Sequence, residues 1–491
     1  MRSLSALLAA LVAAEAVGAE TVLGVYIFSR HGDRTAKATA PANLTDLGYL
    51  EVYTSGTYYR NRYIAANASF PIFGMNTDIV AESQITAAAP SDTVIQNSAA
   101  GWLQGLYPPV GSSLGSNTLR NGSVVYSPLN GYQLIALEHV DSGADLENAG
   151  WLQGSSTCLN AKLSSNNYFS SDEYIATYNR TYDLYQSLLP MINGSFSSSA
   201  ATFKNAYTIW DLLNVASIHN SSDEFRNSEM LTPELYTELK NLAAEHEWGL
   251  AYNESEPIRA VSGMTLAADV LEGLNGTITG KGKNKLNVQF GAYATMLSYF
   301  GLAQLPAAST DFYGLPGYAT TLTWELVTNA TVSSGSFPST DDISVRFLFA
   351  NGTASPSNPL VEFPLFGQSV SPLPWSDFVS ATNEFSLNDH WAWCKACGNS
   401  TGVCSAEILG TSTETDNSSS TASASSSETK KGGISTVVAG VIGAMVTLGV
   451  ILGLELLVIL LAGLRLVKKN RLASPVSSAS GEASSNPLKA A

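Results

Sequence analysis

Short apolar runs alternate with polar, glycine-containing turns over most of the chain, a pattern typical of α/β proteins. Residues 21–28 form an almost continuous apolar and β-branched run, which predicts a buried parallel strand. Residues 286–290, 321–326 and 345–350 predict three further strands. The turn pair Asn351-Gly352 is expected to end the last of them.

Two helices are predicted beside these strands. Thr45 is a suitable N-cap for a helix that runs to about Tyr63. Gly291 turns the chain from a strand into a second helix over residues 292–300, which we expect to end at Gly301. The stretch from about residue 20 to 405 is long for a single core, so we expect a large α/β domain, with or without an inserted helical one.

The ends of the chain carry targeting signals. Residues 1–19 have the basic start, short apolar run and small-residue end of a signal peptide. Residues 434–464 are apolar and long enough to cross a bilayer, and a basic cluster follows them in the tail, 465–491. We therefore predict a single-pass type I membrane protein anchored by one C-terminal helix, with its ectodomain extracellular or luminal, at the cell surface or in a vacuole.

The remaining segments fit this arrangement. Residues 20–409 would form the ectodomain, and the Ser/Thr-rich residues 410–433 an extended stalk. Glu455 interrupts the apolar run, either as a functional intramembrane acid or at a depth that a sliding helix brings near a surface. Twelve Asn-X-Ser/Thr sequons favour a glycoprotein: Asn43, Asn67, Asn121, Asn179, Asn193, Asn220, Asn253, Asn275, Asn329, Asn351, Asn399 and Asn417.

The four cysteines all lie between the two apolar segments. An even number in an oxidising compartment predicts two disulfides, for which three pairings exist. The spacing of Cys394 and Cys397, with Cys404 beyond them and Cys158 elsewhere, also leaves a zinc site as the alternative. The net charge of −16 makes nucleic acid an unsuitable partner and favours a small anion held in one local basic pocket.

The polar loop 29–35 is where such a pocket is expected, because ligands bind at the carboxyl ends of strands in open α/β sheets. Arg30 and Arg34 can each hold a phosphate edge through paired charge-assisted hydrogen bonds. His31 between them is a nucleophile able to form a covalent intermediate with phosphorus, and the neighbouring cations are expected to lower its pKa. The alternative is a surface loop whose arginines pair with acids such as Asp33 or Asp46.

Several motifs together give the chain its resemblance to a known family. They are Ser29-Arg30-His31-Gly32-Asp33-Arg34-Thr35, Leu44-Thr45-x-Leu47-Gly48, Tyr59-Arg60-x-Arg62-Tyr63, Ser98-Ala99 with Trp102-Leu103-Gln104-Gly105, and the later segments 287–302, 321–326 and 345–352. In this order and spacing the chain resembles the histidine acid phosphatases, which include the fungal phytases. The resemblance runs from residue 21 to about 400 and is thin between residues 150 and 280.

The resemblance implies a phosphoglycerate-mutase-like three-layer α/β domain with an inserted, mostly helical second domain. It implies hydrolysis of phosphate monoesters, with His31 as the nucleophile and Arg30 and Arg34 binding phosphate. It calls for no metal and no other cofactor. The partner it implies is a small phosphorylated substrate or phosphate.

Two departures from the family pattern stand out. The family has a further, distal arginine before the Ser-Ala helix, whereas residues 87–98 contain none. The family also has a His-Asp pair where a strand meets the late helix. One register puts Ala292 and Tyr293 there, and an ungapped count back from Gly301 gives Gln289 and Phe290. General acid catalysis typically contributes ~10²–10⁴ in rate, so activity is expected to be reduced.

Other residues are weaker candidates for the missing functions. The other histidines are His139, His219, His246 and His390, and the resemblance places His139 away from the pocket. Glu82 and Asp92 border the pocket that the resemblance implies but are expected to be solvated or capping acids. We therefore predict a phosphoric monoester hydrolase of the acid phosphatase type. The alternatives are a catalytically degenerate phosphate-binding pseudophosphatase and a surface glycoprotein that has kept the fold alone.

Overall fold

The computed structural model of the protein describes residues 20–140, 157–220, 225–333, 336–401 and 404–405. The predicted signal peptide, stalk, apolar run, Glu455 and tail all lie outside these residues. Among the residues described, no helix has both the length and the apolar character that a membrane crossing requires.

A mixed eight-stranded sheet occupies the centre of the fold, in the order β10-β8-β7-β1-β6-β2-β5 with β9 beside β8. The central strand β1 pairs parallel with β6 and antiparallel with β7. All four predicted strands are present. The bounds are β1 Thr21–Arg30, β2 Ile85–Pro90, β5 Glu138–Val140, β6 Leu286–Gly291, β7 Thr321–Thr328, β8 Ile343–Ala350, β9 Val361–Glu362 and β10 Leu373–Pro374.

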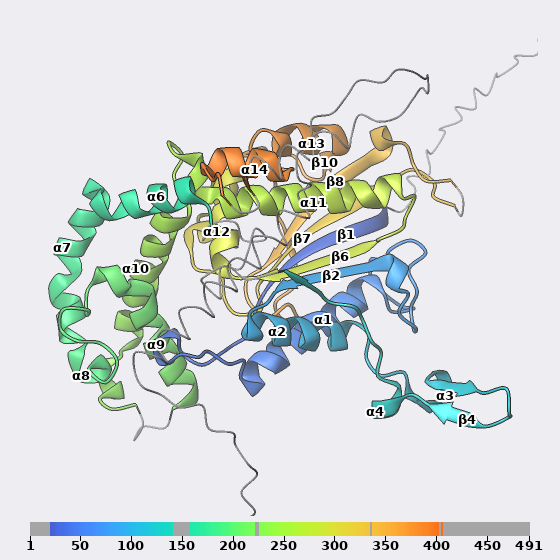
Figure 1. Ribbon diagram of the computed structural model, residues 1–491, viewed down its shortest axis with the longest axis horizontal. Helices are drawn as coiled ribbons and strands as arrows, with labels where there is room; N and C mark the ends of the chain where they lie inside the picture. Colours follow the sequence, from blue (N-terminus) through green and yellow to red (C-terminus); the bar gives the residue numbers. More distant parts are fainter. Residues whose placement is uncertain (1–19, 141–156, 221–224, 334–335, 402–403, 406–491) are drawn as a thin grey trace, which may run out of the picture. The chain divides into compact units, whose positions relative to one another are not determined.

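Helices cover both faces of the sheet, which confirms the three-layer α/β prediction (Figure 1). Helices α1 (Asp46–Tyr63) and α2 (Thr93–Leu106) lie on one face, and α11 (Val261–Thr279) and α13 (Trp375–Asn383) on the other. The alternation of β1 explains the two layers, because successive side chains of a strand point to opposite faces. Ile27 belongs to the apolar core under α1 and α2, whereas Phe28 belongs to the core under α11.

The described residues between β5 and α11 form helices joined by turns and loops and contain no strand, which agrees with the predicted helical insertion. Phe203, Trp210 and Leu242 of this insertion belong to the same apolar core as Phe28 of the sheet. The insertion is therefore held to the α11 side of the sheet by shared burial. Its helices are α6 (Leu159–Asn167), α7 (Asp172–Ser187), α8 (Leu189–Ile192), α9 (Ala206–His219) and α10 (Pro233–Ala251).

The predicted start of helix α1 is confirmed, whereas the predicted end of the second helix is not. Thr45 caps α1 as expected, since its hydroxyl accepts a hydrogen bond from the backbone N–H of Gly48 at 3.0 Å. The predicted end of the second helix is wrong, because α12 (Tyr293–Leu302) continues through Gly301. Gly301 is instead needed for packing: an added Cβ there would collide with the ring of Tyr252.

The four cysteines form two disulfides, Cys158–Cys397 and Cys394–Cys404, as predicted. The zinc alternative is wrong, because oxidised sulfurs are not available as thiolate ligands. Both bridges hold α14 (His390–Cys397): one ties it to the start of α6, and the other closes the loop that follows it.

Candidate active site

The His31 loop, residues 29–35, leaves the carboxyl end of β1 and is fixed by the neighbouring strands. Arg30 N–H donates to the carbonyl of Thr320 at 2.8 Å, and the carbonyl of His31 accepts from Ala319 N–H at 2.9 Å. Gly32 N–H donates to the hydroxyl of Ser98 in α2 at 3.2 Å. The loop therefore lies at the edge of the sheet where the sequence predicts a ligand site.

Two glycines bring the start of α1 against this loop. A Cβ added to Gly32 would collide with the backbone of Gly48, and one added to Gly48 would collide with the backbone of Asp33. Gly32 therefore permits the close approach of another backbone segment. In the structure, the segment it lets approach is the first turn of α1, which explains the glycine of the Leu-Thr-x-Leu-Gly motif.

The imidazole of His31 is buried, with 1% of the residue exposed. Its Nδ1 lies 2.8 Å from the carbonyl oxygen of Gly32. A carbonyl only accepts, so this contact places a proton on Nδ1, and in the neutral imidazole the lone pair is then on Nε2. His31 is thereby held in the tautomer that a nucleophilic imidazole requires.

Arg30 is held beside His31 by aromatic rings and a backbone oxygen. Its guanidinium lies 5.0 Å from the ring centre of Tyr293 and 4.7 Å from that of Tyr318, within cation–π range. It also donates a hydrogen bond to the carbonyl of Pro316. Only 3% of Arg30 is exposed, so its charge is oriented by this packing rather than by solvent.

Arg34 forms a buried ion pair with Asp211 of α9, and neither residue is exposed. The two groups are 3.1 Å apart, and the hydroxyl of Tyr207 accepts a further bond from Arg34 at 3.2 Å. The backbone N–H of Lys37 also donates to Asp211 at 2.9 Å. Sequence analysis considered Asp33 or Asp46 as partners of the arginines, whereas the acid is Asp211.

Asp33 instead bridges the loop to two other elements. Its carboxylate accepts from the hydroxyl of Thr45 at 2.5 Å and lies 2.6 Å from Nε2 of His219, at the end of α9. Its backbone N–H donates to Glu51 of α1 at 2.7 Å. Burial raises the pKa of Glu51 to about 7, against the opposing effect of this hydrogen bond.

The junction of β6 and α12 lies next to the His31 loop, since Gly291 pairs with Arg30 across the parallel strands. Ala292 is the N-cap of α12 and Tyr293 its first residue, so these two residues stand where the strand meets the helix. The register that gave Gln289 and Phe290 is wrong. Gln289 hydrogen-bonds Tyr26 and Asp269, and Phe290 is in the core.

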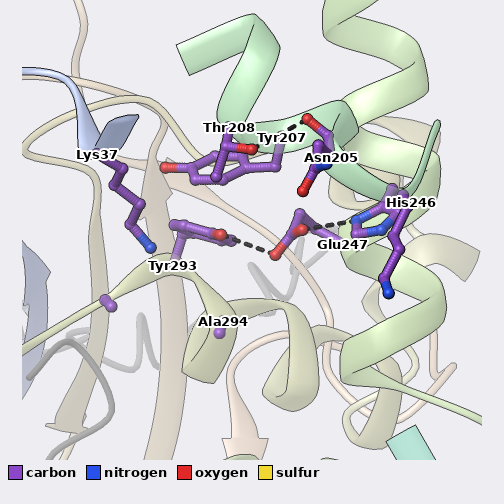
Figure 2. Close-up of a pocket in the computed structure, with 10 residues that line it drawn as sticks. Lys37, Asn205, Tyr207, Thr208, His246, Glu247, Tyr293 and Ala294 are labelled. Atoms are coloured by element: carbon purple, nitrogen blue, oxygen red, sulfur yellow. Dashed lines mark hydrogen bonds and ion pairs between the residues drawn. The ribbon is translucent and has the colours of Figure 1, made fainter. Parts of the chain in front are cut away.

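The hydroxyl of Tyr293 begins a chain of contacts into the helical insertion, which Figure 2 shows. It donates to Glu247 of α10 at 2.7 Å, and the other oxygen of Glu247 lies 2.8 Å from Nδ1 of His246. Burial alone would raise the pKa of Glu247. The contacts with His246 and Tyr293 and the charge of Lys37 outweigh it and lower the pKa. Glu247 is therefore an acceptor that holds the proton of Tyr293.

A cavity of about 230 Å³ opens beside this chain (Figure 2). The ring of Tyr207 packs 4.7 Å from that of Tyr293, and the ammonium of Lys37 lies 5.8 Å from the Tyr293 ring centre. The cavity has two cationic side chains and several polar groups, so it suits an anionic or hydroxylated molecule. It is lined by Lys37, Lys204, Asn205, Tyr207, Thr208, His246, Glu247, Ala292, Tyr293 and Ala294.

The absent distal arginine is not replaced by another cation of that segment. β2 ends at Pro90, and Asp92 caps α2 by accepting from Ile95 N–H at 2.9 Å, as a capping acid should. Glu82 is exposed, as expected for a solvated acid. His139 is exposed on β5, and the structure does not bring it to the loop.

The helical insertion contributes residues to this site that the sequence motifs did not predict. Asp211, His219, His246 and Glu247 all reach the loop or the cavity from α9 and α10. They lie within residues 150–280, where the resemblance is thin. His219 and His246 were considered only as unmarked histidines, because nothing in their spacing indicates the site.

Comparisons with known proteins agree with this architecture. The family model for the histidine phosphatase superfamily (branch 2) matches residues 39–350, more than half of the chain, starting just after the His31 loop. No curated protein matches the chain by sequence.

Two solved structures share the fold. The phytase from Citrobacter braakii is 14% identical, covering 77% of this chain and 99% of its own, with a TM-score of 0.51. The Hafnia alvei phytase is also 14% identical, covering 78% and 99%, with a TM-score of 0.50. Identities this low establish the fold alone, and the family model carries the assignment. The protein belongs to the histidine phosphatase superfamily, branch 2, which confirms the predicted resemblance and supports the prediction of a phosphoric monoester hydrolase.

Proposed function

We propose that this protein hydrolyses phosphate monoesters through a phosphohistidine on His31, with a preference for substrates whose leaving group needs no proton. The observation that carries the proposal is the contact of His31 Nδ1 with the Gly32 carbonyl, which leaves the lone pair on Nε2. Arg30 and Arg34 flank this imidazole at the same sheet edge and would neutralise the phosphoryl oxygens.

The reaction has two steps. Nε2 of His31 attacks phosphorus, the bond to the leaving oxygen breaks, and the phosphoryl group resides on the imidazole. A water molecule then attacks the phosphohistidine, the P–N bond breaks, and phosphate leaves. Nothing at the Ala292–Tyr293 position is suited to protonate the leaving oxygen, because the Tyr293 proton is directed to Glu247. Aryl or acyl phosphates, which leave as weak bases, would therefore react faster than alkyl phosphates.

The ligands of one structurally similar protein support an anionic substrate. The Hafnia alvei phytase has been solved with tartrate and with myo-inositol hexakis sulphate, both polyanions. The cavity beside Tyr293 contains Lys37 and Lys204 and has space for an anionic substituent of a substrate. We propose a small phosphorylated molecule as the substrate class.

Phosphohistidine trapping tests the catalytic proposal. The full chain is incubated with a radiolabelled aryl phosphate and quenched in alkaline detergent, because phosphohistidine is labile in acid. We expect label on the wild-type protein and none on His31→Ala, while His139→Ala, which alters an exposed histidine of β5, stays labelled. If no activated phosphate labels the wild-type protein, the proposed hydrolysis through a phosphohistidine is refuted.

A second candidate is a phosphate-binding protein without turnover. It is favoured by the ion pair between Arg34 and Asp211, which already neutralises one of the two phosphate-binding arginines. It predicts that inorganic phosphate raises the melting temperature of the full chain although no label forms. Arg30→Ala should abolish that increase, whereas Arg120→Ala, at an exposed arginine, should preserve it.

We also propose that residues 434–464 anchor the protein, with residues 20–409 on the luminal or external side. The two disulfides support an oxidising compartment. Carbonate extraction should leave the full chain in membranes, and a stop codon after Lys431 should release the remainder into the medium. Recovery of the full chain in the carbonate-soluble fraction would contradict the anchor.

A further inference from the structure

A second cavity, of about 1140 Å³, lies between the helical insertion and the segment 310–315. It shares no lining residue with the cavity beside Tyr293. Most small-molecule sites have volumes of roughly 300–1,000 Å³, so this cavity has space for several linked rings. It is therefore a separate candidate binding site, and its lining decides which class of ligand it suits.

Three aromatic rings stand together in this cavity. The ring of Trp248 in α10 lies 4.7 Å from the ring of Tyr313 and 5.6 Å from that of Tyr252. Tyr313 is 48% exposed, and the other two residues are partly exposed. The ring of Tyr252 also packs on Gly301, which fixes its position. The cavity therefore offers a ligand a preformed aromatic surface.

The remainder of the lining is polar and mainly acidic. Its charged side chains are five acids and two bases, an arrangement that repels a phosphorylated ligand. The cavity beside Tyr293, which contains Lys37 and Lys204, has the opposite character. Carboxylates and amides are costly to remove from water, so a lipid is also an unsuitable ligand. The acids are Glu173, Glu245, Glu254, Glu256 and Asp311, and the bases are Lys240 and Arg259.

A buried hydroxyl in this lining calls for a hydrogen-bonding ligand. Tyr168 is 4% exposed, and its hydroxyl has no hydrogen-bond partner among the described residues. Its ring packs on Gly249, where an added Cβ would collide with it. Arg259 donates to the carbonyl of the same Gly249 at 2.8 Å. A polar group buried in this way is stabilised by a ligand that supplies its missing hydrogen bond.

A saccharide combines the properties that this lining requires. The C–H groups on one face of a sugar ring pack on aromatic rings, and its hydroxyls donate to carboxylates and accept from amides and tyrosines. A neutral sugar carries no charge that the five acids would repel. The composition of the cavity therefore favours a neutral saccharide over a phosphorylated or apolar ligand.

Two predicted glycosylation sequons give this saccharide a source, because Asn253 and Asn351 both line the cavity. Asn253 directly follows Tyr252 of the aromatic cluster. Its side-chain oxygen accepts a hydrogen bond from the N–H of Ser255 at 2.9 Å. This bond turns the amide nitrogen, the atom that carries a glycan, away from the backbone. A glycan on Asn253 would thus start at the rim of the aromatic surface.

We propose that an N-linked glycan on Asn253 occupies this cavity and packs on Trp248 and Tyr313. A tethered glycan has a high effective concentration at the cavity, so weak contacts with the rings are enough to hold it. It would join α10 to the segment 310–315, because both line the cavity. The inference rests on the proposed luminal placement of residues 20–409 and is independent of catalysis at His31.

The test follows the glycans of the full chain, produced in a secreting eukaryotic host and purified in detergent. Peptide N-glycosidase is added without denaturation, and mass spectrometry of the peptides measures glycan release at each sequon. Asn121 is the matched site, because it is exposed and makes the same turn, with Ser123 N–H at 3.0 Å. We expect release from Asn253 to be at least ~10-fold slower than from Asn121, since the glycan first has to leave the cavity.

Removal of one ring tests whether the cavity causes the protection. Tyr313→Ser should raise the release rate at Asn253 to that at Asn121. Tyr182→Ser, at a tyrosine of α7 that is 42% exposed, should leave Asn253 protected. Melting temperature is the second readout: Asn253→Gln should lower it by roughly 2 °C in the wild type and by much less in Tyr313→Ser. A tyrosine with a merely structural role would make the two losses additive.

Several results would overturn the proposal. They are equal release rates at Asn253 and Asn121, an unmodified Asn253 beside a modified Asn121, protection that survives Tyr313→Ser, and additive losses of melting temperature. A Tyr313-dependent stabilisation by spermine, without protection at Asn253, would assign the cavity to a cation instead. If neither asparagine carries a glycan, the luminal placement fails together with the proposal.

Discussion

The carboxyl ends of β1 and β6 are neighbours in the sheet but carry different chemistry. The end of β1 holds Arg30, His31 and Arg34, which would supply charge and a nucleophile in the proposed reaction. The adjoining end of β6 holds Ala292 and Tyr293, which supply neither a second imidazole nor a carboxylic acid. In the proposed reaction, phosphoryl binding and proton delivery would therefore fall on separate parts of one sheet edge. The residues at the end of β1 suit the first, and those at the end of β6 do not suit the second.

The largest effect is expected at the end of β1. His31→Ala removes the nucleophile, and loss of a nucleophile costs on the order of 10⁴-fold or more in kcat of covalent enzymes. Hydrolysis of p-nitrophenyl phosphate by the full chain measures it. The control variant His139→Ala should keep the wild-type rate. If His31→Ala retains activity, His31 at the end of β1 is not the nucleophile.

The next largest effect is expected at the end of β6. The double variant Ala292→His/Tyr293→Asp places an imidazole and a carboxylic acid beside Arg30, where an acid can protonate the leaving oxygen. We expect alkyl phosphate hydrolysis to rise by ~10²-fold or more, the usual contribution of a general acid. Hydrolysis of an activated aryl phosphate should change much less. The ratio of the two rates is the measurement.

The single variant Tyr293→Phe is the control for this restoration. It removes the hydrogen bond to Glu247 but adds no acid, so the ratio of alkyl to aryl rates should stay at the wild-type value. If the double variant leaves that ratio unchanged as well, the difference between the two strand ends does not set leaving-group preference.

The ends of β1 and β6 also differ in how well the amino-acid sequence predicts them. Residues 21–28 form an almost continuous apolar and β-branched run, so the local pattern alone indicated strand β1 and the loop after it. The position of the His-Asp pair near the end of β6 was ambiguous by three residues, because the strand–helix junction and an ungapped count back from Gly301 gave different registers. A glycine that makes room for Tyr252 is indistinguishable in sequence from one that ends a helix.

The partners of the loop could not be predicted from local patterns. Asp211 contacts Arg34 across 177 residues of sequence, and His219 contacts Asp33 across 186. Such pairs depend on how α9 packs against the sheet, and an isolated acid or imidazole on a helix looks like any solvated residue. The disulfides were predictable in number from the compartment, whereas their pairing depended on where α6 and α14 meet.

A smaller effect is expected from the charge on Arg34. Asp211→Asn keeps a hydrogen-bonding side chain but removes the negative charge that phosphate has to displace. We expect inorganic phosphate to bind about tenfold more tightly, which corresponds to about 1.4 kcal/mol from removing one opposing charge. Calorimetric titration measures the affinity.

Asp183→Asn is the control for the change in net charge. Asp183 is exposed on α7, and its replacement changes the net charge of the protein by the same amount as Asp211→Asn. It should leave phosphate affinity unchanged. Weaker binding in Asp211→Asn would mean that Asp211 orients Arg34 for phosphate instead of competing with it.

The smallest effect is a pH dependence of stability at Glu51, on the β1 side of the comparison. Burial raises the pKa of Glu51 from 4.5 to about 7, so the folded state holds this proton more tightly than the unfolded chain. Stability contributed by the neutral acid is complete below pH 4.5, falls as the pH rises towards 7, and is lost above it. Partial exposure to solvent reduces the effect to about 1 kcal/mol.

Glu51→Gln should remove this decline, because the amide stays neutral and still accepts from the Asp33 N–H. Urea denaturation at pH 4 should give equal free energies of unfolding for variant and wild type, and at pH 8 the variant should be more stable. Glu82→Gln, at an exposed acid, should follow the wild-type profile at both pH values. A variant less stable than wild type at pH 8 would mean that the Glu51 carboxylate stabilises the loop in its charged form.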